Sequence, residues 1–142
     1  MRIAIASDHA GFPLKALLAA DLEAAGHAVA DLGAHDAATP VDYPDFGRRC
    51  AEQVAGGAAD FGVVVCGSGV GISIAANRVP GARCALVHDH LSARLAREHN
   101  DANLIALGAR LTGVETARDA LSAFLSTPFA GGRHAARVAK LG

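Results

Sequence analysis

The sequence predicts a single α/β domain built on a five-stranded parallel sheet with helices on both faces. Short apolar runs alternate with segments of helical periodicity along all 142 residues, and no linker or low-complexity stretch interrupts them. The strand-like runs are continuously apolar, which is typical of parallel strands buried on both faces and joined by right-handed crossovers. A chain of this length buries about 68–70% of its unfolded surface as one domain. We therefore expect residues 1–142 to form one three-layer, doubly wound (Rossmann-like) unit.

The first half of the chain is expected to run strand, helix, strand, helix. Residues 2–7 form the first strand, and residues 13–25 form a helix with Pro13 in its first turn and Gly26 as its stop. Residues 27–33 form a short second strand, and a polar loop then leads to a helix that starts near Pro44. Four leucines of the first helix follow the i, i+3, i+4, i+8 spacing of one buried face: Leu14, Leu17, Leu18 and Leu22.

The second half repeats the alternation three times. Strands are expected at residues 60–66, 83–88 and 104–108, and helices at residues 72–78 and 91–99. A longer helix follows Thr112, which stands three residues before Glu115 with the spacing of a capping box. A last segment after Gly131 and Gly132 carries two arginines. The buried face of the long helix is expected to hold Val114, Ala117, Leu121, Phe124 and Leu125.

The composition excludes several classes of protein. There are 13 basic and 14 acidic residues, so the net charge of −1 leaves no footprint for nucleic acid or an anionic membrane. The N-terminal apolar run meets Asp8 too early for a signal peptide, and glycines break the longest uncharged window. We therefore expect a cytoplasmic protein. The three cysteines are far apart and lack a C-x-x-C pair, so neither a disulfide framework nor a zinc site is predicted.

In doubly wound sheets, ligands bind outside the carboxyl ends of the strands. The segments to inspect are therefore those that follow each predicted strand: Asp8 and His9, Cys66 to Gly69, His88 to His90, and Gly108 to Arg110.

The third of these strands leads into a glycine-rich loop. Gly67, Gly69 and Gly71 give G-x-G-x-G, and Ile72 stands where the dinucleotide fingerprint G-x-G-x-x-G needs its third glycine. Asp89 lies where a ribose-binding acid would be, so a dinucleotide site stays an alternative. With either ligand, the loop offers backbone N–H groups at a helix N-terminus, which suit an anion or a developing oxyanion.

Cys66 is the more specific signal. A free cysteine is usually a small packing residue, and we assign Cys50 and Cys84 to that role. Cys66 differs because it stands directly before a helix N-terminus, where the helix dipole favours the thiolate. A thiolate that faces backbone N–H groups and the Ser68 hydroxyl could act as a nucleophile or as a general base.

Two arginines close the chain. Arg133 and Arg137 are four residues apart, so in a helix their guanidinium groups share one face and suit a phosphate. The alternative is a pair of solvated arginines on a terminal helix. Histidines flank Asp89 at positions 88 and 90, but no third ligand accompanies them, so no metal site is predicted.

Six segments together carry a resemblance to a known family. They read "SDHAGF", "DYPDF", "CGSGVGISIAANR", "REHNDAN", "IALGAR" and "GGRHAAR", in this order, and the likeness runs from residue 2 to about residue 141. The chain resembles the type B ribose-5-phosphate isomerases, in the sugar-phosphate isomerase family that also includes galactose-6-phosphate isomerases.

The resemblance implies aldose–ketose isomerisation of ribose 5-phosphate and ribulose 5-phosphate through a cis-enediolate, with no metal and no organic cofactor. Cys66 matches the family's general base, and His99 matches the residue that opens the furanose ring. The segment from Gly67 to Gly71, with Ser68, matches the part that holds the enediolate oxygen. A branch of the family uses a glutamate base where this chain has Ile72, so the cysteine branch is the better match.

Further site residues also follow from the resemblance. The implied substrate contacts are Asp8, His9, Tyr43, Gly67, Gly69, Gly71, Asn100 and Arg110. Arg133 and Arg137 match the phosphate clamp, which places it in a C-terminal segment of about residues 131–142. The family pattern implies homodimers or homotetramers whose active sites are shared between subunits. Two alternatives stay open: an isomerase of a hexose 6-phosphate such as galactose or allose 6-phosphate, and a non-catalytic nucleotide- or phosphate-binding module.

Overall fold

A computed structural model describes all 142 residues. Its five strands form one parallel sheet in the order β2-β1-β3-β5-β4, which confirms the predicted fold class. The edge strands β2 and β4 are shorter than expected, because an edge strand has a pairing partner on one side only. The bounds are β1 Arg2–Ser7, β2 Ala28–Asp31, β3 Phe61–Cys66, β4 Cys84–Leu86 and β5 Leu104–Gly108.

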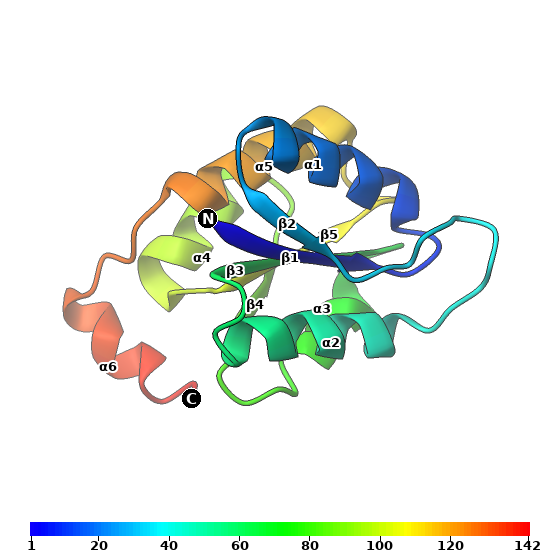
Figure 1. Ribbon diagram of the computed structural model, residues 1–142. Coiled ribbons are helices and arrows are strands. Elements are labelled where there is room, and N and C mark those ends of the chain that lie inside the picture. Colours follow the sequence, from blue (N-terminus) through cyan, green and yellow to red (C-terminus); the bar gives the residue numbers. More distant parts are fainter.

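The helices cover both faces of the sheet (Figure 1). Helices α1, α4 and α5 pack on one face, and α2 and α3 pack on the other. The chain ends in a 3₁₀ turn, η1, and one short helix, α6. The structure contains no helix that could span a membrane. The bounds are α1 Phe12–Ala24, α2 Tyr43–Ala55, α3 Val70–Ala76, α4 His90–Asn100, α5 Val114–Ser126, η1 Gly132–His134 and α6 Ala135–Val138.

The strands alternate their side chains between the two cores. Ile3 and Ile5 enter the core beneath α1, α4 and α5, whereas Ala4 enters the core beneath α2 and α3. On β3, Val65 belongs to the first core and Cys66 to the second. The sulfur at the end of β3 therefore lies on the α2 and α3 side of the sheet.

Four details of the predicted helices are wrong. Helix α3 begins at Val70, two residues earlier than expected, and the N-cap of α5 is Gly113, so Thr112 forms no capping box. Val114 and Leu17 are exposed, at 37% and 42%. On α1 the buried stripe leans toward Lys15 and Ala19, and this rotation turns Leu17 to solvent.

Candidate active site

An open cavity of about 520 Å³ lies at the carboxyl edge of the sheet. The loops that follow β1, β3 and β5 meet there, as expected for a doubly wound sheet. Three exposed apolar side chains, Val70, Ile74 and Leu111, complete its rim. The cavity brings together seven of the predicted site residues: Asp8, Tyr43, Cys66, Gly67, Ser68, Gly71 and Arg110.

Cys66 is the last residue of β3 and only 4% exposed. The backbone N–H of Gly69 donates a hydrogen bond to its Sγ at 3.2 Å. Such a donor stabilises the sulfur more strongly when it is a thiolate than when it is a thiol. The loop after β3 therefore folds back so that one of its backbone N–H groups faces the sulfur.

The other two cysteines lie in the core. Burial raises the pKa of Cys50 to about 12, and it also raises the pKa of the Cys84 thiol. Both stay protonated at neutral pH, and the Cys50 thiol donates to the Ala4 carbonyl at 3.5 Å. They behave as packing residues, as predicted.

The glycines of the loop make room for neighbouring groups. A Cβ on Gly71 would lie 2.5 Å from the ring of Tyr43, and one on Gly67 would lie 3.4 Å from the guanidinium of Arg110. Gly69 has a φ of +78° and caps α3, and it does not line the cavity. Ile72 is fully buried between α2 and the sheet, so that position can hold no base.

Asp8 and His9 follow β1 and have different partners. Asp8 is 7% exposed, and its carboxylate accepts the N–H of Gly11 at 2.8 Å. The Nδ1 atom of His9 accepts the N–H of Val41 at 3.1 Å. Because Nδ1 is the acceptor, a neutral His9 carries its proton on Nε2 and can donate it outward.

Ser68 and Arg110 extend the polar lining of the cavity. The Ser68 Oγ accepts the N–H of Val70 at 3.2 Å, which satisfies one free donor of the first turn of α3. The backbone N–H of Arg110 donates to the Gly67 carbonyl at 2.9 Å and fixes the exit of β5 beside the loop. The Arg110 guanidinium is exposed and makes no ion pair.

Lys15, which no sequence pattern indicated, helps to hold this edge of the sheet. Its side chain is fully buried, and its Nζ donates to both carboxylate oxygens of Asp31 at 2.6 and 2.7 Å and to the Ala34 carbonyl at 2.7 Å. The turn it holds pairs with Ser7, through Ser7 N–H to Gly33 C=O and Ala34 N–H to Ser7 C=O. Lys15 thus fixes the β1 exit directly before Asp8. Because a lysine in an amphipathic helix normally indicates a solvated face, the burial of Lys15 could not be predicted from local sequence.

The remaining predicted residues lie at the opposite edge of the sheet. Helix α4 runs back from the carboxyl end of β4 to the amino end of β5, so His99 and Asn100 at its end are far from Cys66. Helix α6 lies at the end of the molecule where β1 starts, whereas the loop before α2 lies at the other end (Figure 1). Arg133 and Arg137 belong to this distant group.

A basic cluster forms at the amino edge. The ring of His99 stacks on the ring of His134, with centroids 4.3 Å apart and planes 12° apart. Arg133 and Arg137 flank His134 in the sequence, and neither makes an ion pair. Burial lowers the pKa of His134, and the charges of His99 and the two arginines lower it further. Unpaired guanidinium groups beside stacked imidazoles suit an anion such as a phosphate.

His134 is the second residue that the sequence analysis missed. Its only signal was its place between the two arginines in "GGRHAAR". Neither edge alone holds the full predicted set of residues, because Cys66 and the glycine loop are at one edge and the imidazoles and arginines are at the other.

Comparisons with known proteins point to one family. The model of the Ribose/Galactose Isomerase family matches residues 3–141. A putative sugar phosphate isomerase of Bacillus subtilis is 43% identical, over 99% of this chain and 95% of its own length. The ribose-5-phosphate isomerase B of Escherichia coli is also 43% identical, over 96% of this chain and 91% of its own length.

The fold is equally similar. The structure of ribose-5-phosphate isomerase B from Clostridium thermocellum superposes with a TM-score of 0.98 at 51% sequence identity, covering 100% of this chain and 95% of that chain. The likeness therefore extends over both edges of the sheet and includes the C-terminal segment.

Proposed function

The chain belongs to the Ribose/Galactose Isomerase family, and we propose from this that it interconverts ribose 5-phosphate and ribulose 5-phosphate with Cys66 as the general base. It is an aldose–ketose isomerase of the type B class. The observation that carries the assignment of the base is the hydrogen bond from the Gly69 N–H to the Cys66 sulfur, inside the cavity at the strand exits. The three free thiols fit the reducing cytoplasm, where we place the protein.

The reaction moves two protons and needs no oxidant or reductant. The Cys66 thiolate takes the proton from C2 of the open-chain aldose, and the electron pair of that bond passes into a cis-enediolate. The thiol then returns a proton to C1, while a proton moves from O2 to O1, and the ketose results. The N–H groups of the segment from Gly67 to Gly71 stabilise the negative oxygen of the intermediate, and the Ser68 hydroxyl adds a donor.

Substrate contacts surround the base. Asp8, His9, Tyr43 and Arg110 hold the sugar hydroxyls, since they lie in or beside the cavity that contains Cys66. The exposed guanidinium of Arg110 covers Gly67 and makes no ion pair, so it is free to meet an oxygen of the substrate.

Ring opening and phosphate binding use the opposite edge of a second copy of the chain. His99 opens the furanose ring, Asn100 contacts the sugar, and Arg133 and Arg137 hold the phosphate. One copy cannot bring these residues to its own Cys66, because α4 ends at the other edge of the sheet. The apolar rim of the cavity supports an interface there, since Val70, Ile74 and Leu111 are 46%, 60% and 65% exposed. The active unit is therefore a homodimer, alone or within a homotetramer.

The activity is tested with purified protein and ribose 5-phosphate in the presence of EDTA. We expect ribulose 5-phosphate to form with no added metal, and galactose 6-phosphate and allose 6-phosphate to turn over more slowly. A faster hexose reaction would move the assignment to a hexose 6-phosphate isomerase. Binding of NAD without turnover of any sugar phosphate would support the non-catalytic alternative instead.

The shared site is tested by mixing two inactive variants, Cys66→Ala and His99→Ala. If the site joins Cys66 of one subunit to His99 of the other, half of a randomly mixed dimer population has one intact site. About a quarter of wild-type activity should then return. If the site lay within one chain, no subunit of the mixture would hold both groups and no activity would return. The two variants are unfolded, mixed and refolded together so that their subunits exchange. The control is Cys66→Ala alone, taken through the same unfolding and refolding.

A further inference from the structure

A buried arginine lies beneath the basic cluster. Arg97 is 8% exposed, and its guanidinium is 4.9 Å from the ring centroid of Phe61 and 5.8 Å from that of Phe124. Its Nη1 donates to Asp101 Oδ1 at 2.8 Å and to the Ala102 carbonyl at 2.6 Å. A buried charge needs such partners, because burial without them is strongly unfavourable.

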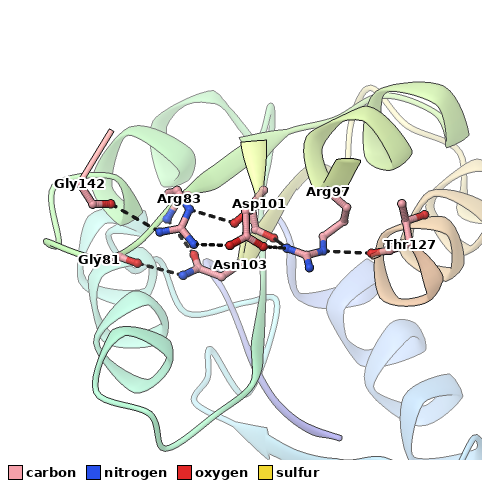
Figure 2. Close-up of polar contacts among 8 residues, drawn as sticks. Gly81, Arg83, Arg97, Asp101, Asn103, Thr127 and Gly142 are labelled. Carbon is pink, nitrogen blue, oxygen red and sulfur yellow. Dashed lines mark hydrogen bonds and ion pairs between the residues drawn. The ribbon is translucent and has the colours of Figure 1, made fainter. Parts of the chain in front are cut away.

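Asp101 joins Arg97 to a second arginine (Figure 2). Its Oδ2 accepts from Arg83 Nη2 at 3.1 Å, and its backbone carbonyl accepts from Arg83 Nε at 2.9 Å. Asp101 caps the end of α4 with a φ of 45°, and it is the only residue other than glycine with a positive φ. An aspartate tolerates this left-handed conformation better than most residues. The two arginines hold it from opposite sides.

The same two arginines reach both ends of the C-terminal arm, residues 127–142. Arg97 Nε donates to the Thr127 carbonyl at 3.3 Å, where the arm leaves α5. Arg83 Nη1 contacts the Gly142 carbonyl at 3.5 Å, at the other end of the arm (Figure 2). Between these points the arm touches the end of α4 directly, because the Ala130 N–H donates to the Glu98 carbonyl at 3.0 Å and the His99 and His134 rings stack.

From these contacts we infer that Asp101, Arg83 and Arg97 are positioning residues that dock the C-terminal arm against α4. The docking sets the arm's Arg133 and Arg137 at a fixed place relative to His99. Figure 2 shows why one carboxylate suffices, since Asp101 lies between the two arginines. The inference rests on the proposed function for its effect on catalysis, because the arm carries the phosphate-binding groups. The docking itself depends only on the contacts described.

Two variants test the docking. Asp101→Asn keeps the left-handed backbone conformation but removes the charge that both arginines share. Arg83→Lys keeps a positive charge but cannot contact Asp101 at two oxygens and Gly142 together. The matched control is Arg94→Lys, because Arg94 pairs with Glu98 on the same helix at 2.7 Å, outside the network.

The primary measurement is amide hydrogen exchange across the arm in the full-length protein. Loss of charge-assisted hydrogen bonds should speed exchange in the arm by about tenfold in both variants. Exchange in β1, β3 and β5 should not change, and Arg94→Lys should behave as wild type. Unchanged exchange of the arm in Asp101→Asn and Arg83→Lys would overturn the inference, as would equal acceleration throughout the fold, which would indicate a general stabilising role.

The second measurement is the inhibition constant of inorganic phosphate in the isomerase assay. Both variants should bind phosphate several-fold more weakly, while the rate of Cys66 alkylation by iodoacetamide in the free enzyme stays unchanged. If the wild type isomerises no sugar phosphate, the proposed function fails, yet the exchange measurement still decides the docking. If activity is present and the arm loosens without weaker phosphate inhibition, the link from docking to the phosphate site is wrong.

Discussion

The hydrogen bond between Val41 and His9 predicts which nitrogen of His9 meets the substrate. The Val41 N–H occupies Nδ1 at 3.1 Å, so Nε2 carries the proton of the neutral ring. Asparagine places a polar atom near the position of Nδ1, and glutamine places one near that of Nε2. His9→Asn should therefore keep the Val41 contact and lose the donor to the substrate, whereas His9→Gln should keep the donor and lose the contact.

His9→Asn should mainly lose activity, whereas His9→Gln should mainly lose stability. A hydrogen bond to a charged or charge-developing oxygen contributes about 1.5–3 kcal/mol, so His9→Asn should lose roughly 10- to 150-fold in kcat/KM. His9→Gln should stay within about threefold of wild type in kcat/KM, but it leaves the half-buried Val41 N–H without an acceptor and should lose about 1 kcal/mol in the free energy of unfolding.

Initial rates with ribose 5-phosphate and urea unfolding of the same preparations measure both effects. The reverse pattern, with His9→Gln the less active variant, would show that Nδ1 meets the substrate and would refute the tautomer assignment. Equal losses in both variants would show that the ring acts through its shape alone.

Three further predictions concern the base, the buried lysine and the arm. Cys66→Ala should lower kcat by about 10²–10⁴-fold or more in initial-rate assays. The control Cys84→Ala should stay near wild type. Near-normal turnover of Cys66→Ala would exclude the thiol as the base. Lys15→Met should lower the free energy of unfolding in urea by about 2–4 kcal/mol, because the buried Ala34 carbonyl loses its donor while the 40% exposed Asp31 side chain is hydrated again. A loss below about 1 kcal/mol would contradict the role given to this ion pair. The pKa of His134 is lowered from its ordinary value of 6.5, so its contribution to arm docking is present above pH 6.5 and is lost as the pH falls through the lowered pKa. Amide exchange of the arm should therefore accelerate on acidification. His134→Gln should reduce this pH dependence of exchange.

The sheet and most of the carboxyl-edge site could be predicted because both depend on local patterns. Continuous apolar runs identify buried parallel strands, and the residues after each run fall at one edge of the sheet. This reasoning placed Asp8, Cys66, Ser68 and Arg110 around one cavity. The start of α3 was misplaced because Gly69 takes a left-handed conformation and begins the helix early, which helical periodicity does not reveal.

The missed residues depend on contacts between distant segments. Lys15 is buried because Asp31 and the Ala34 carbonyl, which belong to another part of the chain, provide its partners. Asp101 could not be recognised as a bridge, since its second arginine, Arg83, lies 18 residues earlier, directly before β4. Neither the Lys15–Asp31 pair nor the Arg83–Asp101 pair leaves a short-range pattern in the sequence, whereas Arg97 and Asp101 have the i, i+4 spacing of a helical ion pair.

The direction of the crossovers explains why the proposed site, with Cys66 and His99 acting together, would need two copies of the chain. In a parallel sheet each crossover helix returns the chain from the carboxyl edge to the amino edge. Residues at the start of a helix can therefore join the strand exits, as Val70 does, and residues at the end of a helix cannot, as His99 shows. No rearrangement of loops would bring His99 to Cys66 of the same chain, because the full length of α4 separates His99 from the carboxyl edge of the sheet. A proton transfer at Cys66 that also needs His99 therefore requires the amino edge of another copy, and its specific activity should fall on dilution below the dissociation constant of the dimer.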